Sequence, residues 1–308
     1  MMIPKVSGEM ITQWMPEWVG LHFDIQELKG GITNQLYRVQ SSDGQGYVLR
    51  IYGERTELFI NRDVEAENMS RLEPLGVTPK VIRYLPDRGV TIVEFIPGSS
   101  LKNEDFLKED LWDRILRPVR IIHRSGIQLS HVFHPLVEVR RLFKMIEDLH
   151  RDYPEFDIQG TLRRLEKIDA LAGVAPSEYV TCHNDLLADN FILRERGEGG
   201  GEVCLIDWEY AGMAPAHYDM ADMFQEILVP RQVEKALLSI YWEGKKIDYH
   251  EYLTDLFKPF PDIYWFLWSL IQLNVSRIPF DYYTYGKTKY ENAQKNIAAL
   301  REQYHLKI

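Results

Sequence analysis

Three polar residues in the second half of the chain have the types and the spacing that phosphoryl transfer needs. Asp185 lies in the loop 183–190, Asn190 ends that loop, and Asp207 follows an apolar run seventeen residues later. Phosphoryl transfer requires a carboxylate that orients the attacking hydroxyl, oxygen ligands for Mg²⁺, and a cation that balances the phosphate charge. We therefore expect Asp185 to accept the proton of a substrate hydroxyl, and Asn190 and Asp207 to hold the Mg²⁺ of a bound ATP.

Two simpler explanations compete with this interpretation. Asp and Asn often populate loops because their side chains hydrogen-bond turns, but here apolar runs at 179–182 and 203–206 flank the whole set. Cys182 and His183 are adjacent, as a nucleophile and its base could be, yet neighbouring residues of a strand point to opposite faces. Phosphoryl transfer therefore remains the preferred hypothesis.

The elements that must position these residues change type about one third of the way along the chain. Strand-like runs with turn residues between them predict strands at 25–28, 36–39, 47–52, 81–84 and 90–95, with a helix at 61–75. Beyond Pro97 helical periodicity predicts helices at 111–124, 137–151 and 160–172, and it returns after Asp222. We predict two lobes, an N-terminal lobe 1–97 with its hinge at about 94–98 and a catalytic lobe 98–308.

Composition limits the kind of protein. The 308 residues are 45% hydrophobic, without a run of about 18 apolar residues, so the chain has enough material for a core and no membrane segment is expected. Two cysteines and the absence of a signal-peptide pattern favour a cytoplasmic location. A net charge of −10 disfavours nucleic acid and favours small cationic ligands. Oligomeric state cannot be predicted from these features.

Several motifs together resemble one known family. The loop HNDLLADN (183–190), followed by LIDWEYA (205–211) and HYDMADMF (217–224), is similar to the choline and ethanolamine kinases, within the aminoglycoside-phosphotransferase branch of the protein-kinase-like fold. The resemblance begins at KGGITNQLYRV (29–39), weakens over 99–177, and returns in the tail at 265–285. It implies a bilobal α+β fold, in which a sheet lobe with one helix binds ATP and a mainly helical lobe binds the acceptor.

The resemblance assigns a nucleotide site to the first lobe. Its glycine-containing phosphate loop corresponds to Gly30, Gly31, Thr33 and Asn34, where small residues let backbone N–H groups approach phosphate. The same glycines would also suit an ordinary hairpin turn.

A charged pair and a hinge complete the expected nucleotide site. Arg50 stands where protein kinases carry their strand-three lysine, and a surface arginine is the simpler alternative. Glu65 matches the helix glutamate that pairs with this cation, and Glu67 competes for that assignment. Backbone groups from Glu94 to Ile96 match the hinge that hydrogen-bonds adenine.

Two further residues match supporting positions of the family. Asp219 resembles the buried aspartate that braces the catalytic loop through backbone amides near His183. His183 itself is expected to be packed and hydrogen-bonded, with a structural role.

The acceptor site is expected in Glu226 and the aromatic tail. Trp265 and Trp268 are three residues apart, so on a helix they share one face, and Gln272 continues that face. Together with Tyr285, the two tryptophans match the aromatic wall that surrounds trimethylammonium in choline kinases. Tryptophans at this spacing are more often ordinary core residues. Glu226 matches an acidic residue near the same pocket.

The residues expected in the acceptor site favour some acceptors over others. The predicted function is ATP-dependent phosphorylation of a small cationic amino alcohol, with choline first and ethanolamine second, because Glu226 and Gln272 would suit a primary ammonium equally well. An aminoglycoside or other small-alcohol kinase is a further alternative, although the tail has few acids. A nucleotide-binding pseudokinase without catalysis is the last.

Overall fold

The first part of the chain is an antiparallel sheet. The computed structural model describes residues 6–28, 34–53, 56–195, 201–276 and 278–308. The sheet has the order β1-β2-β3-β5-β4, built from β1 (Phe23–Leu28), β2 (Asn34–Ser41), β3 (Gly46–Tyr52), β4 (Val81–Leu85) and β5 (Val90–Glu94). All of its neighbours pair antiparallel. The predicted strands are confirmed in type and order, with ends that differ by up to two residues.

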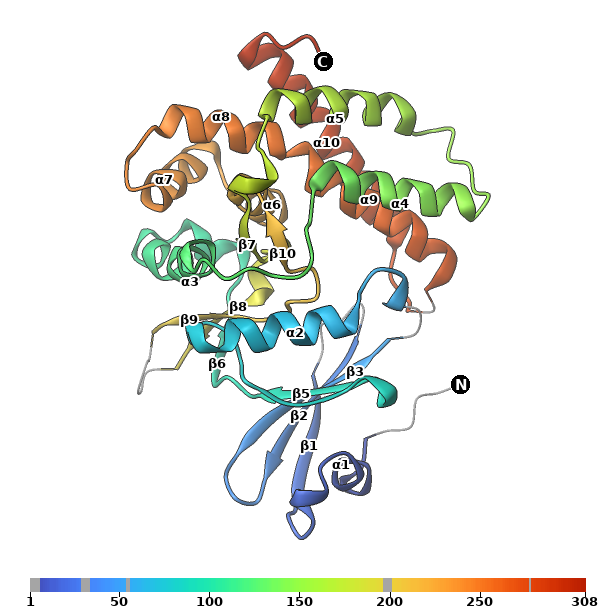
Figure 1. Cartoon of the computed structure of the whole chain (residues 1–308), viewed down its shortest axis with the longest axis vertical. Coiled ribbons are helices and arrows are strands. Elements are labelled where there is room, and N and C mark those ends of the chain that lie inside the picture. Colours follow the sequence, from blue (N-terminus) through green and yellow to red (C-terminus); the bar gives the residue numbers. More distant parts are fainter. Residues whose placement is uncertain (1–5, 29–33, 54–55, 196–200, 277) are drawn as a thin grey trace.

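One helix lies between this sheet and the rest of the molecule (Figure 1). Helix α2 (Arg62–Leu72) begins at Asn61, whose side chain accepts the backbone N–H groups of Asp63 and Val64. A short 3₁₀ turn continues it to Gly76, which adopts a left-handed φ of 71° and ends the element. A second helix, α1 (Gly8–Trp14), packs on the outer part of the sheet and was not predicted.

The second part is mainly helical, as predicted. Its helices are α3 (Trp112–Arg124), α4 (Pro135–Asp148), α5 (Ile158–Ala172), α6 (Ala216–Ile227), α7 (Arg231–Tyr241), α8 (Ile247–Phe257), α9 (Pro259–Val275) and α10 (Tyr282–Tyr304). Helices α9 and α10 pack against each other, and the C-terminal end of α10 lies at the end of the molecule farthest from the sheet (Figure 1). No helix within the described ranges has the length and apolar character of a membrane span.

Two small sheets carry the segments that flank Asp185. Strands β7 (Val180–Cys182) and β10 (Gly212–Ala214) pair with each other. Strands β6 (Gly98–Ser100), β8 (Phe191–Arg194) and β9 (Val203–Leu205) form the other sheet in the order β6-β8-β9. The loop 183–190 therefore leaves one small sheet and enters the other, which fixes both of its ends.

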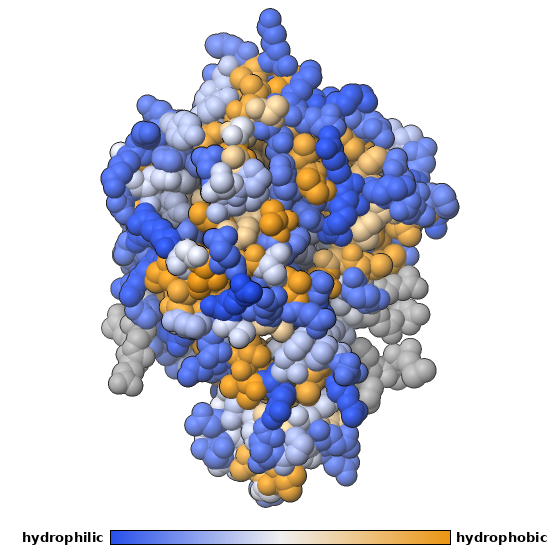
Figure 2. Space-filling view, in the orientation of Figure 1, coloured by the Kyte–Doolittle hydropathy of each residue, from blue (hydrophilic) through white to orange (hydrophobic). Residues whose placement is uncertain are grey.

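The buried side chains form three clusters. One contains residues of α1 and of the five-stranded sheet. A second contains residues of α4, α5, α8, α9 and α10. The third lies between them and includes Met69 and Leu72 of α2 together with residues of α3, β9 and α6. On the face shown in Figure 2, hydrophobic groups are interspersed among hydrophilic side chains. The division into lobes at residue 97 stays a proposal, because α2 shares its core with residues beyond that position.

Candidate active site

The loop that follows β7 is held in place by a side chain of α6, Asp219. The carboxylate of Asp219 accepts the backbone N–H of His183 at 3.0 Å and that of Asn184 at 2.7 Å. Asn184 has a φ of 65°, and its side chain donates to the carbonyl of Tyr210 at 3.0 Å. These contacts hold a left-handed residue immediately before Asp185.

His183 and Cys182 are both enclosed in the core. His183 Nε2 donates to the carbonyl of Ile206 at 2.8 Å, its ring packs on Trp208, and burial lowers its pKa. The thiol of Cys182 donates to the carbonyl of Ala214, and burial raises its pKa well above the ordinary value. A buried neutral thiol is a poor nucleophile, which argues against the alternative Cys–His chemistry.

Asp185 and Asn190 are in direct contact. The amide nitrogen of Asn190 donates to the carbonyl of Asp185 at 2.8 Å and to its carboxylate at 3.3 Å, and both side chains are buried. Burial, followed by the charges of Asp222, Asp207 and two glutamates, raises the pKa of Asp185 well above its ordinary range. A carboxylate in this setting binds a proton readily, as a general base must.

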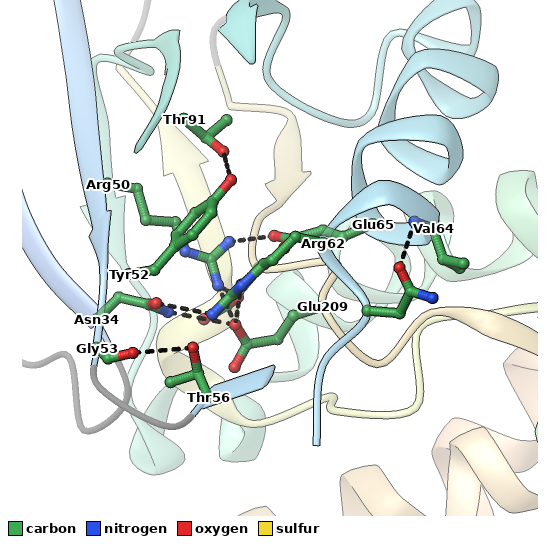
Figure 3. Close-up of polar contacts among 12 residues, drawn as sticks. Asn34, Arg50, Tyr52, Gly53, Thr56, Arg62, Val64, Glu65, Thr91 and Glu209 are labelled. Carbon is green, nitrogen blue, oxygen red and sulfur yellow. Dashed lines mark hydrogen bonds and ion pairs between the residues drawn. The ribbon is translucent and has the colours of Figure 1, made fainter. Parts of the chain in front are cut away.

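Asp207 forms an ion pair with Arg50 of β3. Nη2 of Arg50 lies 2.7 Å from Asp207, and Nη1 lies 2.6 Å from Glu65 on α2. The same Nη2 also contacts Glu209 (Figure 3). Partial desolvation raises the pKa of the half-buried Asp207 to about 7, although Arg50 acts against the shift. Asp207 has a φ of 67°, so the backbone turns sharply where β9 ends.

Glu67, the alternative partner of Arg50, lies elsewhere. Its carboxylate contacts Arg71 at 2.5 Å and Ser130 at 3.0 Å on the exposed side of α2. The structure therefore places Glu65 against Arg50, as the sequence interpretation favoured. Helical geometry explains the difference, because residues two apart point to different faces.

Sequence reasoning missed two members of this network. Arg62 lies 2.7 Å from Glu65 and 3.1 Å from Glu209, and its guanidinium lies over the ring of Tyr52 (Figure 3). It also donates to the side chain of Asn34 at 3.0 Å, and Asn34 donates to Glu209 at 3.2 Å. The motif LIDWEYA could have revealed Glu209, which stands two residues after Asp207, whereas Arg62 lies in a charged helix without a distinctive signal.

The acids at this position suit a hard divalent cation. Carboxylate oxygens of Glu65, Asp207 and Glu209 lie within 4.8 Å of one another. The nitrogen of the Asn190 amide is engaged by Asp185, so its oxygen is the end available to a metal. Oxygen ligands of this kind match Mg²⁺, and Asp207 is 34% exposed and thus accessible.

The remaining residues expected to bind the nucleotide are the phosphate loop and the hinge. Gly30, Gly31 and Thr33 lie outside the described residues. In the hinge, Glu94 ends β5 and its N–H donates to the carbonyl of Lys80, while Ile96 is buried. Adenine binding by the backbone of 94–96 stays a proposal.

The aromatic residues of the tail do lie together. Trp265 and Trp268 on α9 pack edge to face with ring centroids 5.7 Å apart, and Tyr285 of α10 lies 6.4 Å from Trp268. Both tryptophans are almost fully buried, and Gln272 is buried on the same helix. The structure therefore groups the three rings predicted from the sequence, in a densely packed setting.

Asp222 connects these rings to the loop 183–190. Its Oδ2 accepts the backbone N–H of Leu186 at 2.7 Å, and its Oδ1 lies 3.5 Å from the indole nitrogen of Trp265. Glu226 follows one turn later on α6 and contacts Lys289 of α10 at 2.5 Å. Sequence reasoning assigned no role to Asp222 or Lys289.

Comparison with known proteins agrees with this geometry. The family model described as "Choline/ethanolamine kinase" matches residues 25–252. Mouse "Ethanolamine kinase 2" is 27% identical over 315 residues, covering 93% of this chain and 78% of the relative. The human "Ethanolamine kinase 1" is 27% identical over 91% of this chain and 69% of its own length.

Solved structures show the same fold. The choline kinase LicA from Streptococcus pneumoniae has a TM-score of 0.79 and 27% identity, covering 94% of this chain and 98% of that one. A kanamycin and GDP complex of an aminoglycoside phosphotransferase shares the fold at a TM-score of 0.64 and 16% identity. Fold and site thus define a phosphotransferase with an alcohol group as acceptor. More narrowly, the chain belongs to the choline/ethanolamine kinase family.

Proposed function

We propose that this protein transfers the γ-phosphoryl group of Mg²⁺-bound ATP to the hydroxyl of a small amino alcohol, with choline as the first candidate and ethanolamine as the second. One observation carries the proposal. The loop that presents Asp185 is tied through Leu186 and Asp222 to Trp265, so the expected base and the expected amine pocket share one hydrogen-bonded frame. A substrate held by its ammonium group beside Trp265 would present its hydroxyl toward the loop.

The nucleotide side of the proposal depends on Arg50 and Arg62. Both guanidinium groups lie among Glu65, Asp207 and Glu209, where phosphate oxygens could replace carboxylates as partners. Asp207 and Asn190, with Glu209 as an added candidate, would hold Mg²⁺, which neutralises charge on the transferring phosphoryl group when bound. A solved complex of LicA, 26% identical to this chain, contains AMP and supports a nucleotide in this fold.

Proton transfer would belong to Asp185. Its raised pKa makes it a ready proton acceptor, provided that it is ionised when the substrate arrives. A substrate ammonium group nearby would favour ionisation, because a positive charge lowers the pKa of a carboxylic acid. Binding of the amine and activation of the base would therefore support each other.

Different residues favour each of the two acceptors. The grouped rings of Trp265, Trp268 and Tyr285 favour choline, whose quaternary ammonium group can interact with aromatic faces but cannot donate hydrogen bonds. The buried Asp222 and the partly buried Glu226 favour ethanolamine, whose ammonium group is a donor. Curated relatives with either name match this chain, which supports the amino alcohol class as a whole.

The test is an ADP-release assay over choline, ethanolamine, homoserine and an aminoglycoside, with Mg²⁺ and with a chelator. We expect Mg²⁺-dependent turnover with at least one of the two amino alcohols. Background rates with both would overturn the proposal. Nucleotide binding without ADP release from any acceptor would instead indicate a pseudokinase.

We also propose a cytoplasmic location. The two cysteines are both free and buried, which suits a reducing compartment. Fractionation of cells that express the full chain would test this location.

A further inference from the structure

A buried lysine lies beside the expected amine pocket. Lys289 of α10 has a side chain that is 8% exposed, and its ammonium group lies 2.5 Å from Glu226 and 3.8 Å from Asp262 of α9. It also donates to the backbone carbonyl of Gln225 at 3.4 Å. Lysine is seldom buried unless it is paired, and here two other helices, α6 and α9, supply its partners.

The position of this ammonium group overlaps with the proposed substrate contacts. Its nitrogen lies 5.8 Å from the ring centroid of Tyr285, the residue one turn earlier on α10. Tyr285 is one of the proposed cage rings, and Glu226 is the acid assigned to the same pocket. Lys289 thus already contacts one aromatic and one acidic group that a substrate cation would use.

The charges around Lys289 keep it protonated. Burial alone would lower its pKa, but Glu226, Asp262 and Asp222 outweigh burial and raise it. Asp185 belongs to the same electrostatic environment, because it acts on Tyr285 together with these three acids. The ammonium group of Lys289 therefore lies between two carboxyl groups, 2.5 Å from Glu226 and 3.8 Å from Asp262.

We propose that Lys289 is a specificity-determining residue that disfavours a quaternary ammonium substrate more than a primary one. This inference rests on the proposed amino alcohol kinase function. A primary ammonium group can donate hydrogen bonds to the carboxylates and so share Glu226 with Lys289, with acids and cations alternating. A trimethylammonium group cannot donate, stays farther from the acids, and meets the charge of Lys289 without that compensation.

The experiment compares Lys289→Met with Lys287→Met. Lys287 is on the same helix, is exposed, and lies 4.0 Å from Glu291, so its replacement removes the same charge outside the pocket. We measure kcat/KM for choline and for ethanolamine, and circular dichroism checks folding. The choline-to-ethanolamine ratio should rise at least about ten-fold in Lys289→Met and stay within about two-fold in Lys287→Met.

A second variant should change the choline-to-ethanolamine ratio in the opposite direction. It also keeps the inference testable if Lys289→Met does not fold. Lys289→Arg keeps the positive charge but fills more of the space beside Tyr285, so the same ratio should fall at least about three-fold. The inference is overturned if the ratio changes less than two-fold in whichever of these variants folds. Because the wild-type protein must first phosphorylate an amino alcohol, failure of the proposed function would appear separately, as absence of turnover before any substitution.

Discussion

The carboxylate of Asp219 accepts the backbone N–H of Asn184 at 2.7 Å and so supports a left-handed residue next to the proposed catalytic base. Asp219 is fully buried and also accepts from His183 and from His123. A non-glycine residue with positive φ persists only when its surroundings determine it. The position of Asp185 therefore depends on a side chain of α6.

Replacing Asp219 with alanine should damage stability and activity together. The substitution leaves buried donors without an acceptor, and each such group costs about 1–3 kcal/mol. We expect a melting temperature at least about 5 °C lower, measured by differential scanning fluorimetry. Asp113→Ala removes an exposed acid that pairs with Arg120, and it should leave the melting temperature nearly unchanged. Equal effects of the two substitutions would show that Asp219 does not support the loop.

Asp185→Asn should separate catalysis from folding. Loss of a general base typically lowers kcat by about 10²–10⁴-fold, while ATP affinity should stay within about three-fold. The variant should also melt at a higher temperature, because burial opposes the charge of Asp185 and the amide carries none. The matched control is Asp189→Asn in the same loop, where the acid is exposed and pairs with Lys102. Turnover above a tenth of the wild-type value in Asp185→Asn would exclude Asp185 as the base.

Glu65 and Glu67 lie on the same helix, so substitutions at the two positions can be compared as a variant and its control. Glu65→Gln weakens two charged contacts, to Arg50 and Arg62, and should lower kcat/KM for ATP by about ten- to a hundred-fold. Glu67→Gln loses an exposed pair with Arg71 and should have little effect. Steady-state kinetics with varied ATP would measure both. A comparable loss in both variants would mean that α2 as a whole, and not the Arg50 contact, determines activity.

Asp262 should make stability depend on pH. Burial raises the pKa of Asp262 from its ordinary value near 3.8 to about 8, although Lys289 acts in the opposite direction. Between these values the folded protein binds more protons than the unfolded chain, so this residue's contribution to stability decreases as pH rises. Asp262→Asn removes that dependence. The unfolding free energy of the variant relative to wild type should therefore increase with pH, by at most about 1.4 kcal/mol per unit.

Urea unfolding at pH 5, 6.5 and 8 would measure this difference. Asp248→Asn serves as the control, because Asp248 is a fully exposed acid of α8. A constant difference between Asp262→Asn and wild type at all three pH values would contradict the prediction. Reversibility must be established first, since a free energy requires equilibrium.

The sequence predicted the parts of the molecule that follow local rules. The loop 183–190, the strands around it and α2 carry turn residues and hydrophobic periodicity that are visible in a short window. Strand β6 was missed because Gly98, Ser99 and Ser100 have no hydrophobic pattern, and pairing with β8 alone makes them a strand. The strand propensity of a short segment contains no information about pairing with a strand more than ninety residues away.

Two of the residues that the sequence analysis missed, Arg62 and Lys289, were missed for the same reason. Arg62 and Lys289 lie in charged helices, where such side chains usually face solvent, so only the tertiary structure shows that both are enclosed by acids. Glu65 and Asp207 were found because their spacing matches a family pattern. Spacing predicts which residues could meet, but the pairing of charges depends on how the helices pack.

The shared core of α2 has a mechanical consequence. Met69 and Leu72 pack with the helical part of the chain, and Asn68 donates to the carbonyl of Ala211 at 2.9 Å. Arg50, in contrast, belongs to β3. A motion that separated the five-stranded sheet from the helices would carry Arg50 away from Asp207, and away from Glu65 as well where α2 stays with the helices. Opening the molecule would thus also disassemble the charge arrangement that we propose to bind phosphate, and under this proposal only the closed form would be competent for transfer.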